Sequence, residues 1–173
     1  ILAYDPRQEY ELRRLIRQLC DELDRKGWSV ESISLGQLLL DRIEGDEPRL
    51  VESTIGAERR LHGRHPGRAL NYLKEKIGRY VEGRDGIAAD VIRKIGEIAD
   101  RHPEQADRTV IFLGRMGALY PFFRSSAILK HLDGGTRNLP VVLLYPGERR
   151  GPTALSFMGE LAADTDYRPR IYS

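Results

Sequence analysis

Hydrophobic positions in the first 45 residues alternate between short apolar runs and helical spacing. The run over residues 1–4 ends at Asp5-Pro6, a pair typical of a strand that leads into a capped helix. Apolar residues then recur three or four positions apart from Leu12 to Leu23, which predicts an amphipathic helix. A second strand is predicted over residues 28–35, and Ser34 followed by Gln37 is typical of the start of another helix. Residues 1–45 therefore predict the order β-α-β-α.

The pattern changes between residues 46 and 105, where almost no strand signal is present. Apolar spacing predicts three helices, near residues 50–61, 70–81 and 87–98, and the last one ends before His102-Pro103. We expect this segment to be a helical insertion or lobe on an α/β core. The whole chain, residues 1–173, is expected to form a single α/β domain.

Strand signals return in the last third of the chain. Continuous apolar runs predict strands over residues 109–113 and 140–145, the second ended by Pro146-Gly147, with a helix over 118–132 between them. Short strands are also expected over 154–158 and 170–172. Because continuous apolar strands that alternate with helices are typical of parallel sheets covered on both faces, the predicted fold class is α/β. Its expected architecture is three-layered, with a mostly parallel sheet, flanking helices and the helical insertion in the middle.

Composition indicates the class of protein and its cellular location but does not define a function. Hydrophobic residues make up 40% and charged residues 31% of the 173 positions, which is typical of a globular chain that can close a core. Cys20 is the only cysteine and cannot form an internal disulfide, so we expect a reducing, cytoplasmic location. No apolar run approaches the ~20 residues of a membrane span. The abrupt apolar start without Met leads us to expect natural residues upstream of Ile1.

The sequence contains none of the common motifs for catalysis or cofactor binding. The turn after the first predicted strand is Asp5-Pro6-Arg7-Gln8, and neither GxxxxGK[ST] nor GxGxxG occurs anywhere. His62 and His65 lack a third metal ligand nearby, and Ser125-Ser126 lack a nucleophile elbow. We therefore predict a protein that is not an enzyme and that has no catalytic residue, metal or cofactor. The strand-helix-strand layout over 109–145 leaves one alternative open, a nucleotide-binding regulator with a degenerate P-loop-like sheet.

Charge is distributed unevenly, although the net charge of the chain is only +2. Residues 1–56 carry a net charge of −4, residues 57–84 carry +5, and residues 85–173 carry +1. A basic helical face with interleaved Tyr72 and Tyr80 favours contact with a phosphate backbone, although it could equally dock an acidic partner. The candidate nucleic-acid residues are Arg59, Arg60, Arg64, Arg68, Lys74 and Arg79.

A second notable stretch, residues 114–124, follows a predicted central strand and combines aromatic residues with arginines. The carboxyl ends of parallel strands commonly carry ligand and partner sites, and aromatic residues and Arg are frequent in the energetic centres of protein interfaces. We expect Phe122 or Phe123 to pack a helix on the sheet. The candidate partner-binding residues are Arg115, Tyr120, Phe123 and Arg124.

Several segments resemble the BrxB family of bacteriophage-exclusion (BREX) defence systems. The resemblance is densest over residues 110–171 and loose over 46–105, and its motifs are mostly apolar and structural. The resemblance rests on the segments LGRMGALYPFFRSS from Leu113, LDG from Leu132, PVVLLYPG from Pro140 and LSFMG from Leu155, with ILAYDP at the start and YRPRI from Tyr167.

The resemblance implies a non-catalytic component of a multi-protein phage-defence system. Its expected neighbours are a PglZ alkaline-phosphatase-like protein, a DNA adenine methyltransferase and a large ATPase. An assembly or adaptor role, with PglZ and other BREX subunits as partners, is the favoured interpretation. A DNA-contacting subunit that uses residues 57–84 and the degenerate nucleotide-binding regulator are the alternatives.

Overall fold

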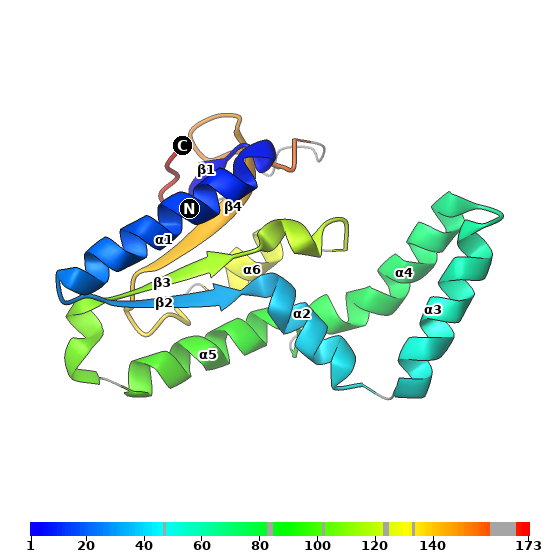
Figure 1. Ribbon diagram of the computed structural model, residues 1–173, viewed down its shortest axis with the longest axis horizontal. Coiled ribbons are helices and arrows are strands. Elements are labelled where there is room, and N and C mark those ends of the chain that lie inside the picture. Colours follow the sequence, from blue (N-terminus) through cyan, green and yellow to red (C-terminus); the bar gives the residue numbers. More distant parts are fainter. Residues whose placement is uncertain (47, 83–84, 102, 123–124, 133, 160–168) are drawn as a thin grey trace.

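The computed structural model describes residues 1–46, 48–82, 85–101, 103–122, 125–132, 134–159 and 169–173 of the chain (Figure 1). Four strands run parallel in the order β1-β4-β3-β2, and a fifth strand, β5, pairs antiparallel with β4. The strands are β1 (Leu2–Tyr4), β2 (Ser29–Ser34), β3 (Thr109–Gly114), β4 (Val141–Arg149) and β5 (Leu155–Phe157). The predicted α/β class with a mostly parallel sheet is therefore confirmed.

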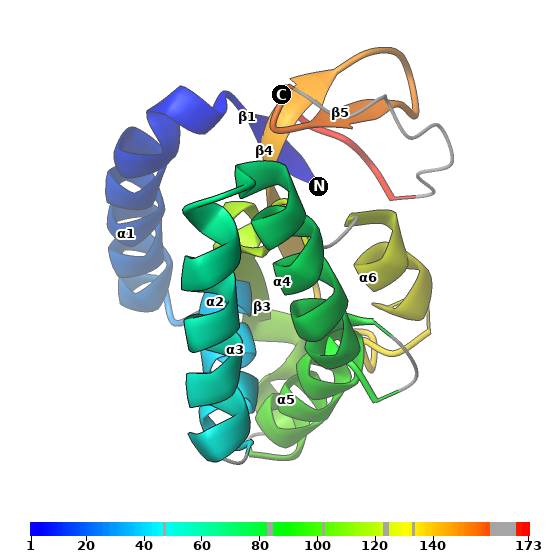
Figure 2. The same ribbon diagram turned by 90° about the vertical axis from the view of Figure 1, so that its right-hand side faces the viewer.

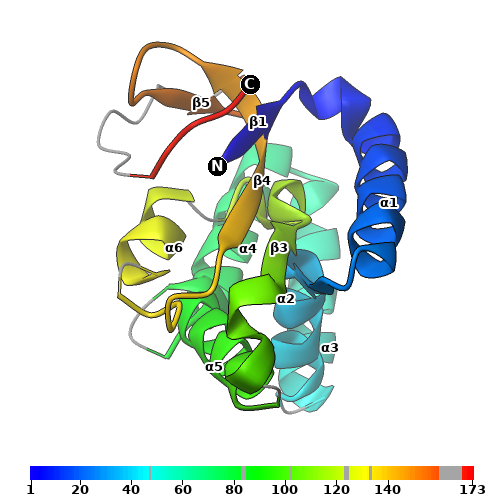
Figure 3. The same ribbon diagram turned by 90° about the vertical axis from the view of Figure 1, so that its left-hand side faces the viewer.

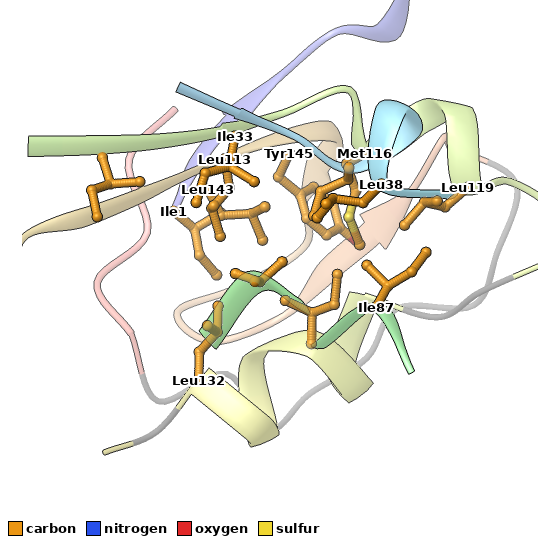
Figure 4. Packing of buried hydrophobic residues seen from close by; sticks show 14 of the residues in the cluster. Ile1, Ile33, Leu38, Ile87, Leu113, Met116, Leu119, Leu132, Leu143 and Tyr145 are labelled. Carbon is orange, nitrogen blue, oxygen red and sulfur yellow. The ribbon is translucent and has the colours of Figure 1, made fainter. Parts of the chain in front are cut away.

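The helices lie on both faces of this sheet (Figure 3). Among the described residues, α1 covers one face, through half-buried residues such as Leu12 and Ile16. The other face carries the larger core, built with residues of α2, α5 and α6 (Figure 4). Those helices are α1 (Glu9–Arg25), α2 (Leu35–Glu44), α5 (Ile87–Arg101) and α6 (Ser125–Leu132). The three-layer architecture follows from this unequal covering of the two faces.

Local signals place several element boundaries where the sequence predicts them. Asp5 caps a short 3-10 helix, η1 (Pro6–Gln8), by accepting a hydrogen bond from the Arg7 N–H at 2.9 Å. Ser34 caps α2 by accepting from the Gln37 N–H at 3.2 Å. Gly27 follows α1 with φ +77°, a left-handed conformation that favours glycine at a helix end.

Two boundary predictions are wrong. The helix expected over 118–132 is divided: a 3-10 helix, η3 (Met116–Leu119), ends at an extended Tyr120, and α6 begins only at Ser125. Pro121 explains the break, because a proline disfavours helical geometry in the residue before it. The strand expected to stop at Pro146-Gly147 continues to Arg149, because its outer half pairs with β5.

The helical middle segment is confirmed, and it divides into two parts. Helix α5 joins the layer that covers the sheet, through buried Ile87, Val91 and Ile95. Helices α3 (Pro48–His62) and α4 (Pro66–Val81) instead form a hairpin that projects from the rest of the chain (Figures 1 and 2). We call this pair the α3–α4 hairpin and the remaining elements the body. Among the described residues, no helix combines the length and apolar character needed to cross a membrane.

Candidate functional site

The carboxyl edge of the parallel sheet brings together the residues that follow β1, β2 and β3. Arg115 comes directly after β3, is exposed, and has a left-handed backbone with φ +63° at the start of η3. A Cβ atom on Gly36, in the first turn of α2, would lie 2.9 Å from the Ala118 Cβ. Only glycine allows this close approach, which packs α2 against η3 and fixes the place of Arg115.

Tyr4, Glu9 and Arg13 form a hydrogen-bonded network at the same edge. The Tyr4 hydroxyl, at the end of β1, donates to one carboxylate oxygen of Glu9 in the first turn of α1. Arg13 donates to the other oxygen through Nε at 2.8 Å and Nη2 at 2.7 Å. This network joins the edge of the sheet to the outer surface of α1.

The network holds both of its titratable groups in one protonation state near neutral pH. Burial, followed by the hydrogen bond to Glu9, raises the pKa of Tyr4 far above its ordinary value. Burial opposes ionisation of Glu9, but hydrogen bonds from Tyr4 and Arg13 outweigh it, so the pKa of Glu9 is lowered. The positive charge of Arg115, at the same edge of the sheet, also lowers the pKa of both groups, although less than the other causes do. Tyr4 is therefore a neutral donor and Glu9 a carboxylate.

Tyr10 extends this arrangement to the solvent, where 82% of it is exposed. The Arg13 guanidinium lies 5.2 Å from the centroid of the Tyr10 ring, within the range of a cation–π contact. We call Tyr10, Arg13 and Arg115 the carboxyl-edge surface. Of these three residues, only Arg115 was predicted from the sequence. Arg13 lies three residues after Tyr10 and four after Glu9, and this spacing indicates that the three side chains share one face of a helix.

Tyr120 has a largely structural environment. It is half-buried, and its ring centroid lies 6.0 Å from that of Phe157, which in turn packs edge-on against the buried Tyr145 at 5.5 Å. Phe122 is half-buried in the same segment. The other two partner candidates, Phe123 and Arg124, lie outside the described residues. Of the predicted partner-binding set, the structure thus exposes Arg115 and packs much of Tyr120 against the core.

The candidate nucleic-acid residues separate along the α3–α4 hairpin. Arg59 and Arg60 lie in the last turn of α3, Arg64 in the connecting turn, and Arg68 in the first turn of α4. We call residues 59–68 the hairpin tip, and all four arginines there are exposed. Lys74 is exposed halfway along α4, and Arg79 lies at the other end, next to the body.

Arg79 is held in place at the base of the hairpin. It forms an ion pair with Asp46 and a cation–π contact with Tyr80, whose hydroxyl also donates to Asp46. Across an open hollow of about 370 Å³, Arg42 pairs with Asp90 and donates to the Gly86 carbonyl at 3.0 Å. These contacts join α2, α4 and α5, so the hollow lies where the hairpin is attached.

Three further features concern metal binding, the lone cysteine and the turn after β1. No group of three or more His, Cys, Asp or Glu side chains in those ranges could hold a metal ion. Burial and the neighbouring Asp21 raise the pKa of the half-buried Cys20, which keeps it a thiol. The turn after β1, where a P-loop would cradle phosphate, is η1 with a carboxylate cap.

Comparison with known proteins identifies relatives of the chain. The family model described as "BrxB: BREX protein BrxB" matches residues 31–171. The curated BREX protein BrxB of Bacillus cereus (strain H3081.97) is 23% identical over 169 residues, which cover 97% of this chain and 79% of that protein. No solved structure matches the chain.

Proposed function

The chain belongs to the BrxB family and is a component of a BREX phage-defence system, and within that system we propose a non-catalytic assembly role. The partner it binds is the PglZ alkaline-phosphatase-like subunit, and the contact is made through the carboxyl-edge surface. Other BREX subunits are held in the same assembly. This role combines the family membership with the exposed aromatic and arginine side chains that the described residues place at the sheet edge.

The ordered exposure of Tyr10 is the observation that carries the proposal. Tyr and Arg are the residue types that most often dominate the binding energy of protein interfaces. Tyr10 lies under Arg13, and Arg13 is oriented by two hydrogen bonds to Glu9. Because these side chains are already ordered, a partner that binds them loses less rotamer entropy than it would on mobile side chains.

The protonation states of the edge network support the non-catalytic part of the proposal. A general acid or base works best when its pKa lies near the operating pH. The pKa of Tyr4 is raised and that of Glu9 is lowered, so both are moved away from neutrality. The network therefore suits orientation of Arg13 better than proton transfer.

The decisive experiment measures binding to the PglZ-like protein of the same gene cluster. The double variant Tyr10→Ala/Arg115→Ala is expected to weaken the complex about 10- to 100-fold in calorimetry, since two central contacts are truncated. The matched control is Arg25→Ala/Arg108→Ala, which removes two exposed cations at the amino edge of the sheet, one at the end of α1 and one just before β3. Unchanged affinity of the test variant, or no complex between the wild-type chain and PglZ, would contradict the proposal.

No observation favours the nucleotide-binding alternative. The turn after β1 contains no glycine, and the Asp5 side chain accepts hydrogen bonds from Arg7 at the position where a P-loop offers N–H groups to phosphate. We expect a calorimetric titration of the chain with ATP to give no heat of binding. A saturable binding isotherm would restore that alternative.

A further inference from the structure

The hairpin tip, residues 59–68, concentrates positive charge, with Glu58 as the neighbouring carboxylate in α3. Residues 59–68 include four arginines and two histidines, and neither Asp nor Glu occurs among them. The arginines come from the end of α3, the connecting turn and the start of α4, so folding gathers them at one end of the hairpin. In Figure 1 this end lies away from the sheet, on the side where the hairpin projects.

The four arginines of the tip are also unpaired with respect to the described part of the chain. Arg59, Arg60, Arg64 and Arg68 are exposed, and none makes an ion pair or a side-chain hydrogen bond with a residue in the described ranges. Some arginines of the rest of the chain are neutralised, as in Arg79–Asp46 and Arg42–Asp90, whereas others on the body, such as Arg17 and Arg108, are exposed singly rather than gathered at one end. Charges left without partners at a projecting end are available to an external anion.

We propose that the hairpin tip binds the phosphate backbone of duplex DNA without reading its base sequence. This contact goes beyond the assembly role at the carboxyl edge and does not depend on it. Positively charged side chains that neutralise phosphates supply most sequence-independent affinity for DNA. The complementarity between unpaired arginines and regularly spaced phosphates is the basis of the proposal.

The rest of the tip favours nucleic acid over an acidic protein. A protein interface normally has an apolar centre surrounded by polar residues. At the tip Leu61 is half-buried in the hairpin, and the exposed positions beside the arginines are His62, Gly63, His65, Pro66 and Gly67. Such a surface presents positive charge, and its small residues let a ligand come close, but it has almost no apolar area that a protein partner could bury.

The position of the tyrosines favours duplex over single-stranded DNA. Binding of single strands relies on aromatic rings on which bases stack. Tyr72 is half-buried with Lys76 over its ring, and Tyr80 packs at the base of the hairpin. The aromatic residues that the sequence interleaves with the arginines are therefore not part of the tip.

The dimensions of the hairpin also predict which part of the duplex it touches. Fifteen residues of α3 extend about 22 Å, long enough to hold the tip clear of the body. Two packed helices are roughly 20 Å wide, whereas the major groove is about 12 Å wide. The tip is thus too broad to enter the groove and rests on the phosphates along its rims, which position a protein without specifying sequence.

The test is fluorescence anisotropy of the full chain with a 30-base-pair duplex. If four phosphates are contacted, the affinity is expected to fall about 100-fold between 50 and 200 mM NaCl. Duplexes of unrelated sequence should compete equally. The tip variant Arg59→Gln/Arg60→Gln/Arg64→Gln/Arg68→Gln is expected to lose at least 100-fold in affinity at 50 mM NaCl and most of the salt dependence.

The matched control removes four exposed cations from the body, as Arg17→Gln/Arg25→Gln/Lys26→Gln/Arg108→Gln. It should retain affinity within a few-fold and keep the salt dependence, and circular dichroism should show both variants folded. An equal loss in the control, no loss in the tip variant, or tenfold preference for single strands would overturn the proposal. Loss of PglZ binding by the tip variant while the wild-type chain fails to bind DNA would assign the tip to a protein partner instead.

Discussion

The body and the α3–α4 hairpin are built on different principles. In the body, β3 is almost entirely buried: Ile111 is fully buried, and so is Leu113, which lies within the core shown in Figure 4. No residue of α3, whose whole length the structure describes, is buried, and α4 buries only Ala69 and Val81. The hairpin helices pack against each other and are attached to the body at one end.

This difference relates stability to function. The body is stabilised by burial of apolar surface, so its charged residues are free to form an ordered surface at the sheet edge. The hairpin gains little from burial, and its shape instead holds the arginines of the tip away from the body. The body therefore presents a preorganised surface for a protein partner, and the hairpin presents positive charge at a distance from the body.

The largest expected contrast is between two leucines. Leu113→Ala removes a fully buried side chain of β3 and should lower the free energy of unfolding by about 2–5 kcal/mol. Leu50→Ala, on α3 at a residue that is 44% exposed, should cost less than about 1 kcal/mol. Urea denaturation followed by circular dichroism measures both. Equal losses would mean that the hairpin has a core as important as that of the body.

A second contrast uses two glycines. A Cβ on Gly147 in β4 would overlap the Ser156 carbonyl oxygen, so Gly147→Ala should destabilise by about 2 kcal/mol or more. Nothing lies within 4 Å of a Cβ on Gly78 in α4, so Gly78→Ala should stabilise by about 0.5–1 kcal/mol through helix propensity. Thermal unfolding gives the sign of each effect. A stabilising Gly147→Ala would contradict the β4–β5 pairing.

The attachment between the two regions is expected to have an intermediate effect. Arg42→Ala removes the ion pair with Asp90 and the hydrogen bond to the Gly86 carbonyl, and should cost about 1–2 kcal/mol. Hydrogen exchange should rise first in α3 and α4, while β3 stays protected. Arg14→Ala, which removes an exposed ion pair with Glu11 on α1, is the control. Uniformly faster exchange would show that the hairpin does not open separately.

The smallest effect concerns the charge network of the body. The pKa of Glu9 is lower in the folded state than in the unfolded state, so the unfolded state takes up protons first as the pH falls. Its stabilisation is complete above the unfolded-state pKa and is lost as the pH drops through the folded-state pKa. Glu9→Gln should cost about 1 kcal/mol or less at pH 7 and nothing at pH 2. Urea unfolding at several pH values checks this convergence, and a constant difference would contradict it.

Much of the fold was predictable because its signals are local. The apolar spacing from Leu12 to Leu23 predicts α1, and Ser34 with Gln37 predicts the start of α2. The BrxB resemblance, carried by motifs after Leu113, was confirmed by the family match over residues 31–171. Each of these features depends on neighbouring residues or on a run of sequence, so no knowledge of distant contacts is required.

The wrong predictions arise where distant segments meet. Pro146-Gly147 is a local signal for the end of a strand, but pairing with β5 extends β4 through it. Nothing in the local sequence of Glu9 shows that the Tyr4 hydroxyl binds it, although the spacing to Arg13 is visible. The end of such a strand, or such a hydrogen bond, depends on which distant segment the fold brings next to it.

The basic segment shows most clearly what each level determined. The sequence by itself determined that residues 57–84 carry a net charge of +5 on helices. Only the tertiary structure decided that Arg79 is paired with Asp46 at the base, while Arg59 and Arg64 are exposed at the tip and pair with no carboxylate of the described residues. The physical reason is that composition sets the number of charges, whereas the antiparallel packing of α3 and α4 sets which of them meet a carboxylate and which face solvent.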